Sequence, residues 1–178
     1  MGHKTFIAEV KTKSPYGFVS PHSWDYLFSE ANVIGDWISI HTDTRWAGSM
    51  DLIKKARSLT DKPILAKGFH ETDEQIEEAI LAGADYVLVV GRIPAVHQDK
   101  CLIEPYSFVE PDGLQHGLYK VVWNDRDLKT GEKKDINFNL ARQYYKGWLC
   151  QASNIVSRED IHPEADAILV GTNLLNFV

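Results

Sequence analysis

Ionisable residues recur at the ends of short apolar runs along this sequence. Two glutamates and two lysines stand out among them: Glu9, Lys11, Lys67 and Glu104. A charged side chain inside an apolar run is costly to bury unless a partner neutralises it. Four such groups that converge on one pocket can neutralise one another and shift one another's pKa values. These residue types therefore predict proton donation and acceptance, the chemistry of acid–base catalysis.

Other polar residues stand where further apolar runs end, and some of them indicate a second kind of site. They are Asn124, Arg126, Ser153, Asn154, Gly171 and Thr172. The last two pairs each precede a helical turn, where backbone N–H groups and a helix N-terminus can bind phosphate. We therefore expect a phosphorylated small molecule as the substrate.

Eight apolar runs predict the strands that must position these residues. Most runs are continuous rather than alternating, which is typical of parallel strands covered on both faces. They lie at 6–11, 37–41, 63–67, 86–90, 101–104, 119–124, 148–153 and 167–171. Helical patterns lie between them at 23–31, 49–59, 72–82, 136–145 and 157–161. This alternation predicts an α/β fold, a closed (β/α)8 TIM barrel, whose active site forms at the C-terminal ends of the strands.

The chain length restricts the helices of such a barrel. The sequence has 178 residues, whereas these barrels typically have about 250. Only residues 92–100 separate the fourth and fifth strands, and Pro94 disfavours a helix there. We therefore expect a minimal barrel in which helices 4, 5 and 8 are reduced or absent; the alternative is an open doubly wound sheet. No linker or composition shift divides the sequence, which predicts a single TIM-barrel domain over residues 1–178.

Composition argues against several other classes of protein. The formal net charge of -6 is unfavourable for a nucleic-acid binder, which needs a basic face. No apolar run approaches the ~18 residues of a membrane span and no signal peptide is evident, so we expect a cytoplasmic protein without membrane contact. Cys101 and Cys150 lack the spacing of a metal site, so no metal is expected. The sequence leaves open whether the chain is a monomer or a homodimer.

The same residues resemble the indole-3-glycerol phosphate synthase family of tryptophan biosynthesis. Residues 8–17, Ala-Glu-Val-Lys-Thr-Lys-Ser-Pro-Tyr-Gly, resemble its first-strand motif, Glu-x-Lys-x-x-Ser-Pro-Ser-x-Gly. Residues 124–128, Asn-Asp-Arg-Asp-Leu, resemble its Asn-Asn-Arg-Asp-Leu motif. Weaker similarity follows the family's order at 42–49, 67–69, 75–88, 102–104, 152–155 and 169–175.

The resemblance implies a reaction and a set of roles. The family converts 1-(2-carboxyphenylamino)-1-deoxyribulose 5-phosphate to indole-3-glycerol phosphate, with loss of carbon dioxide and water and without a cofactor. Lys67 is then the general acid of ring closure, and Glu104 and Lys11 are the base and acid of dehydration. Lys11 can also hold the substrate carboxylate, while Glu9 and Asn124 orient these groups and bind hydroxyls.

The resemblance also implies binding residues. The phosphate would lie on Ser153, Asn154, Gly171 and Thr172, with Ser14 nearby. Arg126 would fix carboxylates from behind by its forked guanidinium. Trp46 and Phe69 would pack against the anthranilate ring, or else belong to the core.

Departures from the family pattern leave other functions open. Gly68 stands where the family has Asp, Ala152 where it has Glu, and Asn154 where it has Gly. The sequence also begins at the first strand, so we expect it to lack the family's N-terminal extension and to bind substrate more weakly. The alternatives are a related phosphate-binding isomerase and a non-catalytic barrel that acts as a binding protein.

Overall fold

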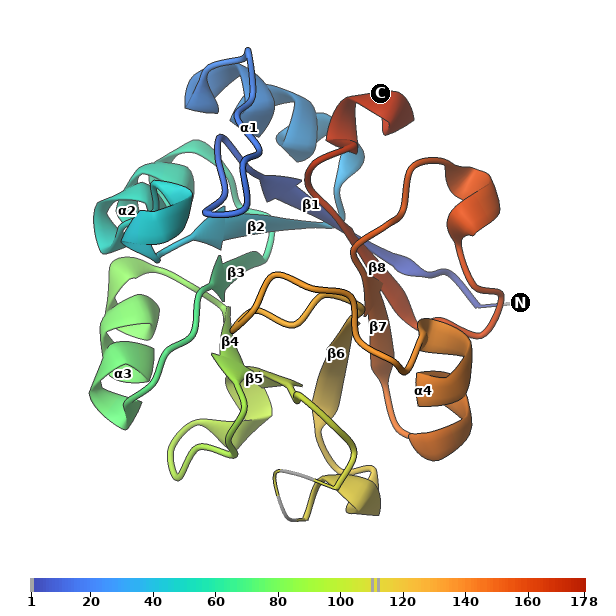
Figure 1. Ribbon diagram of the computed structural model, residues 1–178. Helices are drawn as coiled ribbons and strands as arrows, with labels where there is room; N and C mark the ends of the chain where they lie inside the picture. Colours follow the sequence, from blue (N-terminus) through green and yellow to red (C-terminus); the bar gives the residue numbers. More distant parts are fainter. Residues whose placement is uncertain (1, 110, 112) are drawn as a thin grey trace.

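The computed structural model describes residues 2–109, 111 and 113–178. In this part of the chain, eight parallel strands close into a barrel in sequence order (Figure 1). The strands are β1 (Thr5–Val10), β2 (Trp37–His41), β3 (Ile64–Lys67), β4 (Tyr86–Val90), β5 (Cys101–Glu104), β6 (Lys120–Asn124), β7 (Leu149–Ala152) and β8 (Ala167–Val170). The predicted closed barrel is confirmed, and the open sheet is wrong because β8 pairs with β1.

Strand register determines which side chains share a level of the barrel. Glu9 lies opposite Ser39, and His41 lies opposite Lys67. Side chains alternate between the two faces of a strand, so one set fills the barrel and the other meets the surrounding helices.

The first three helices begin within one residue of the predicted positions. The second and third also end where predicted, whereas the first continues to Ile34 instead of ending at residue 31. They are α1 (Trp24–Ile34), α2 (Met50–Leu59) and α3 (Asp73–Ala82). Each starts after a hydroxyl residue whose side chain accepts a backbone N–H of the first turn: Ser23, Ser49 and Thr72. Such a cap typically contributes about 1 kcal/mol. Gly83 ends α3 with a φ of 120°, a conformation that side chains disfavour.

The connections that follow β4, β5 and β8 contain no full helix, as predicted for the fourth, fifth and eighth helices of the barrel. Short 3₁₀ turns replace helices before β5 (Gln98–Lys100), before β6 (Leu114–His116) and after β8 (Leu174–Phe177). Between β6 and β7 the chain forms α4 (Phe138–Tyr144), and a 3₁₀ turn at Arg158–Asp160 precedes β8. No helix among the described residues is long and apolar enough to cross a membrane.

The barrel interior is packed at its N-terminal end. Trp37 stacks on Tyr86 with ring centroids 4.1 Å apart and on Trp148 with centroids 6.1 Å apart. Above this aromatic layer, Leu65 and Leu102 are fully buried. Side chains therefore fill the lower half of the barrel, which leaves the opposite mouth for a ligand.

Candidate active site

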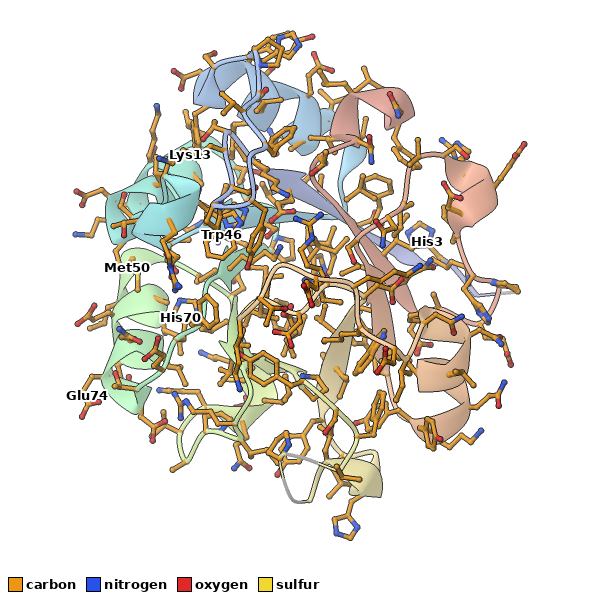
Figure 2. The ribbon with its side chains drawn as sticks, viewed as in Figure 1. His3, Lys13, Trp46, Met50, His70 and Glu74 are labelled. Atoms are coloured by element: carbon orange, nitrogen blue, oxygen red, sulfur yellow. The ribbon has the colours of Figure 1, made fainter. Side chains whose placement is uncertain are left out.

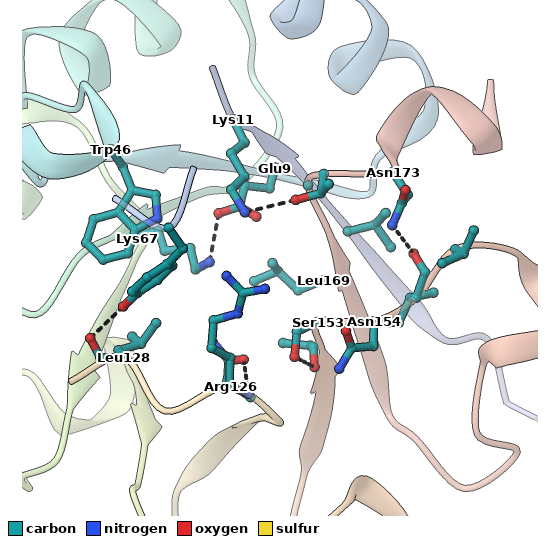
Figure 3. A pocket seen from close by; sticks show the side chains of 18 residues that line it. Glu9, Lys11, Trp46, Lys67, Arg126, Leu128, Ser153, Asn154, Leu169 and Asn173 are labelled. Atoms are coloured by element: carbon teal, nitrogen blue, oxygen red, sulfur yellow. Dashed lines mark hydrogen bonds and ion pairs between the residues drawn. The ribbon is translucent and has the colours of Figure 1, made fainter. Parts of the chain in front are cut away.

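A cavity of about 220 Å³ opens at the carboxyl ends of the strands (Figure 3). Its wall combines the ends of β1, β3, β6, β7 and β8 with the loops that follow them. Its charged and polar residues include Glu9, Lys11, Lys67, Asn124, Arg126, Ser153, Asn154 and Thr172. Residues far apart in sequence meet here because closure brings all carboxyl ends of parallel strands to one mouth.

Glu9 is the centre of the charged part of this wall. Lys67 Nζ donates to Glu9 Oε1 at 2.7 Å, and His41 Nε2 lies 2.5 Å from the same oxygen. The Glu9 side chain is 3% exposed and the Lys67 side chain 14%, so the pair is largely removed from water. Gly171 gives the carboxylate room, because a Cβ at this position would clash with Glu9 Oε2.

Burial and charge act in opposite directions on this pair. Burial alone would raise the pKa of Glu9, but the contacts with Lys67 and His41 hold that pKa well below its ordinary value. Burial alone would lower the pKa of Lys67, but the charges of Glu9 and Glu104 raise it. Lys67 therefore keeps its proton near neutral pH and can donate it to a substrate atom.

Glu104 lies at the end of β5, next to Asn124 and Lys67 of the cavity wall. The carboxylate is hydrogen-bonded by Asn124, its Oε1 has no hydrogen-bond partner among the described residues, and the residue is 2% exposed. Burial raises the pKa of Glu104, and the opposing charges of Lys67 and Lys134 do not cancel that effect. A carboxylate in this state can accept a proton, as a general base must.

Lys11 is the second lysine in the cavity wall. Its Nζ donates to Thr172 Oγ1 at 2.9 Å, a contact that joins the end of β1 to the loop after β8. Burial lowers the pKa of Lys11. The ammonium therefore gives up its proton more readily than that of an exposed lysine, which suits a general acid.

Arg126 lines the cavity, as expected for a residue that binds the substrate. Within the described part of the chain it forms no ion pair with a carboxylate, so its expected role of fixing carboxylates stays a prediction. Instead its guanidinium lies over the Tyr16 ring, 5.0 Å from the centroid, and lines the cavity. The guanidinium thus keeps hydrogen-bond donors for an anionic ligand.

The predicted phosphate-binding loops meet on one side of the cavity. Ser153 and Asn154 have φ values of 64° and 57°, so Asn154 adopts the left-handed conformation expected where the family has Gly. The Ser153 hydroxyl donates to its neighbour Ala152 and accepts the N–H of Asp125, so it is already engaged. Backbone groups are therefore the better candidates for binding phosphate.

Three predicted ligand-binding residues lie at the edges of this cavity or outside it. Ser14 does not line the cavity; it is 8% exposed and its hydroxyl accepts the Tyr16 N–H. Trp46 lines the cavity and also a smaller apolar one of about 20 Å³, which Phe69 shares. Figure 2 shows Trp46 on the inner side of α2, between this helix and the centre of the barrel, whereas Glu74 lies on the outside of the molecule. Trp46 is 8% exposed, so it packs in the interior and still presents a face to the cavity.

The structure explains why residue 68, which follows Lys67, is a glycine. A Cβ at Gly68 would clash with Thr42 Oγ1, which lies 2.9 Å from His70 Nε2. His70 Nδ1 in turn lies 2.5 Å from the Leu88 carbonyl oxygen. In this chain a buried histidine network therefore occupies the space beside Lys67, where the family has an aspartate.

Sequence reasoning missed three residues at this site: Tyr16, His41 and Lys134. Burial lowers the pKa of His41, and the neighbouring Glu9 carboxylate opposes that effect. The alternation of β2 could have revealed it, because His41 shares a strand face with Ser39 and ends its run at the level of Lys67. The described residues contain no cluster of three or more His, Cys, Asp or Glu side chains placed to bind a metal ion.

Comparison with known proteins agrees with this arrangement. Residues 2–105 match the family model described as indole-3-glycerol phosphate synthase. The enzyme of that name from Aquifex aeolicus is 32% identical, with 95% of this chain and 75% of the relative covered. The one from Thermococcus kodakarensis is 29% identical, with coverage of 95% and 85%.

A solved structure supports the fold alone. The crystal structure of KGPDC from Streptococcus mutans matches with a TM-score of 0.63 and 16% identity, covering 94% of this chain and 87% of that one. The family model and the sequence relatives carry the assignment further, because they span the motifs that supply Glu9, Lys11, Lys67 and Glu104. The chain therefore belongs to the indole-3-glycerol phosphate synthase family.

Proposed function

We propose that this protein is a carboxy-lyase that closes the indole ring in tryptophan biosynthesis. Its substrate would be 1-(2-carboxyphenylamino)-1-deoxyribulose 5-phosphate and its product indole-3-glycerol phosphate. The observation that carries the proposal is the buried Lys67 ammonium, held 2.7 Å from Glu9 at the mouth of the barrel. The relatives do not favour an isomerase or a non-catalytic barrel.

The charges of the site suit a substrate with two anionic groups. Lys11, Lys67 and Arg126 line the cavity, whereas Glu9 is the carboxylate in its wall. The substrate brings a carboxylate and a phosphate, which the surplus of positive charge attracts. Lys11 or Arg126 would hold the carboxylate, and the loops at Ser153–Asn154 and Gly171–Thr172 would bind the phosphate through backbone N–H groups.

Lys67 would act in the first step. The aromatic carbon that bears the carboxylate attacks the ketone carbon, and Lys67 protonates the ketone oxygen as the new carbon–carbon bond forms. Carbon dioxide then leaves, and the electron pair of the broken bond restores the aromatic ring. Glu9 would hold the ammonium in place for this transfer, because their contact fixes the Lys67 Nζ.

Glu104 and Lys11 would act in the second step. The hydroxyl formed in ring closure leaves as water after Lys11 protonates it, and Glu104 accepts the proton from the adjacent carbon. The raised pKa of Glu104, caused by burial, suits a group that takes up a proton. Asn124, which hydrogen-bonds this carboxylate, would keep it oriented.

The aromatic ring would bind against Trp46, next to the small apolar cavity that Phe69 shares. Flat apolar walls there exclude water and restrict the ring to a few orientations. The reacting carbon would then face the lysines, since Lys67 lines both cavities.

A turnover assay tests the proposal. Purified protein is mixed with the carboxyphenylamino substrate, and indole fluorescence reports the product. Lys67→Ala should lower kcat by about 10²–10⁴-fold, the usual effect of losing a positioned general acid. Lys54→Ala, on the exposed side of α2, is the matched control and should leave kcat unchanged. No turnover by the wild type above the Lys67→Ala variant would overturn the proposal.

A further inference from the structure

The loop that follows β6 lies across the mouth of the barrel and meets the loop that follows β1. Tyr16 forms this junction: its hydroxyl donates to the Leu128 carbonyl oxygen at 2.5 Å, over a sequence separation of 112 residues. Tyr16 and Leu128 both line the cavity. The contact therefore closes one side of the site.

The loop after β6 has a glycine where the Tyr16 ring packs. Gly131 has a φ of 77°, and a Cβ there would lie 2.6 Å from Tyr16 Cδ1. Real Cβ atoms do not approach a ring carbon so closely, so the ring and a side chain at 131 exclude each other. The backbone at this position is thus shaped to receive the tyrosine.

The same ring supports Arg126. The guanidinium lies 5.0 Å from the ring centroid, and the backbone N–H of Arg126 donates to Asn124 Oδ1 at 2.9 Å. Trp46 also contacts the Tyr16 ring, edge to face, with ring centroids 5.9 Å apart. Since no carboxylate in the described part of the chain pairs with Arg126, the aromatic face is the contact that holds its side chain.

We propose that Tyr16 is a positioning residue that holds the Arg126 guanidinium over the cavity to bind an anionic group of the substrate. This inference rests on the proposed function. The ring supplies a cation–π contact, and the hydroxyl ties the two loops so that the ring cannot turn away. Tyr16 itself does not need to touch a reacting atom.

The proposal predicts a change in substrate binding rather than in chemistry. The substrate carboxylate and phosphate both keep their charge until ring closure is complete. A contact between Arg126 and either anion is therefore equally strong in the ground state and in the transition state of ring closure, so its loss raises KM and leaves kcat nearly unchanged. Tyr16→Ser removes the ring and the phenolic hydroxyl that reaches Leu128, and should raise KM about tenfold, the size of a partly buried cation–π contact. Tyr16→Phe keeps the ring and should raise KM less.

A double-mutant cycle separates this role from general loop stability. If Tyr16 acts through Arg126, Tyr16→Ser should raise KM much less in an Arg126→Ala background than in the wild type. Equal effects in both backgrounds, or a fall in kcat without a rise in KM, would overturn the proposal. Thermal unfolding of each variant checks that the barrel remains folded.

A spectroscopic readout keeps the test independent of turnover. The Arg126 side-chain Nε–H signal in a ¹H–¹⁵N spectrum should carry a ring-current shift from Tyr16, which Tyr16→Ser abolishes and Tyr16→Phe retains. If the wild type turns nothing over but this pattern holds, the proposed reaction fails while the positioning of Arg126 stands. If the Arg126 signal is the same in all three proteins, the inference about Tyr16 is wrong.

Discussion

The ends of β1 and β5 each bury one carboxylate, and the surrounding residues hold the two in opposite ways. Glu9, at β1, has Lys67 at 2.7 Å and His41 at 2.5 Å, and these contacts keep its pKa low despite burial. Glu104, at β5, has an oxygen without a hydrogen-bond partner among the described residues, and burial raises its pKa. A buried carboxylate that is compensated by close hydrogen-bond and charge partners stays ionised and can anchor a cation. A buried carboxylate with fewer such partners takes up a proton more readily. The comparison therefore favours positioning at the β1 end and proton transfer at the β5 end.

The largest expected effect is on turnover at the β5 end. Glu104→Gln removes the proposed base and should lower kcat by about 10²–10⁴-fold. The same change should stabilise the fold at neutral pH, because the penalty for burying this charge disappears. Because the pKa of Glu104 is raised in the folded state, the cost of burying its charge is absent below the unfolded-state pKa and complete above the folded-state pKa. The gain in stability from Glu104→Gln should therefore vanish in acid.

Paired assays and unfolding curves over pH check both parts. Glu78→Gln, on the exposed face of α3, is the matched control and should change neither kcat nor stability. A Glu104→Gln protein that keeps normal kcat would contradict the proposed role of the β5 end in proton transfer.

The next effect is on stability at the β1 end. Glu9→Gln leaves the buried Lys67 ammonium without its close partner and should cost about 3–5 kcal/mol at neutral pH. Because the folded-state pKa of Glu9 is lowered, its contribution is present above the unfolded-state pKa and is lost as pH falls through the folded-state pKa. The wild type and the variant should therefore converge in acid, as urea unfolding at several pH values would show. Equal destabilisation by Glu9→Gln at every pH would contradict the ion-pair interpretation.

The smallest effect concerns the charges around Glu104. Lys134 lowers the Glu104 pKa by its charge, and its Nζ donates to the Pro105 carbonyl oxygen at 3.1 Å. Lys134→Met should raise the Glu104 pKa further, so the acidic limb of the kcat profile should move to higher pH while kcat at the plateau changes little. Lys133→Met, the exposed neighbour, should leave the limb in place; an identical shift in both variants would indicate a general charge effect.

Local signals in the sequence predicted the elements well. The helices predicted at 23–31, 49–59 and 72–82 all form. Hydroxyl residues at 23, 49 and 72 cap them, because a side-chain oxygen needs only a backbone N–H two or three residues away. Pro94 correctly indicated a connection without a full helix, since proline cannot donate the hydrogen bond that a helix interior needs. Strand order followed from the alternation of strands and helices.

Contacts within the site were harder to predict. Glu9, Lys11, Lys67 and Asn124 do meet in one cavity, because each ends an apolar run. The alternation of β2 could have revealed His41, but the positions of Tyr16 and Lys134 depend on loops that meet across the barrel, and no short stretch of sequence records those contacts. Ser14, expected near the phosphate, does not line the cavity, and its hydroxyl accepts the Tyr16 N–H.

The sequence by itself determined the strands, the capped helices and the kinds of charge available at the strand ends, because those follow from propensities and patterns a few residues long. Only the tertiary structure decided that Glu9 is compensated and Glu104 is not, and that Arg126 lies on an aromatic ring rather than on a carboxylate. Compensation depends on distance and burial, which arise when strands separated by tens of residues close into a ring.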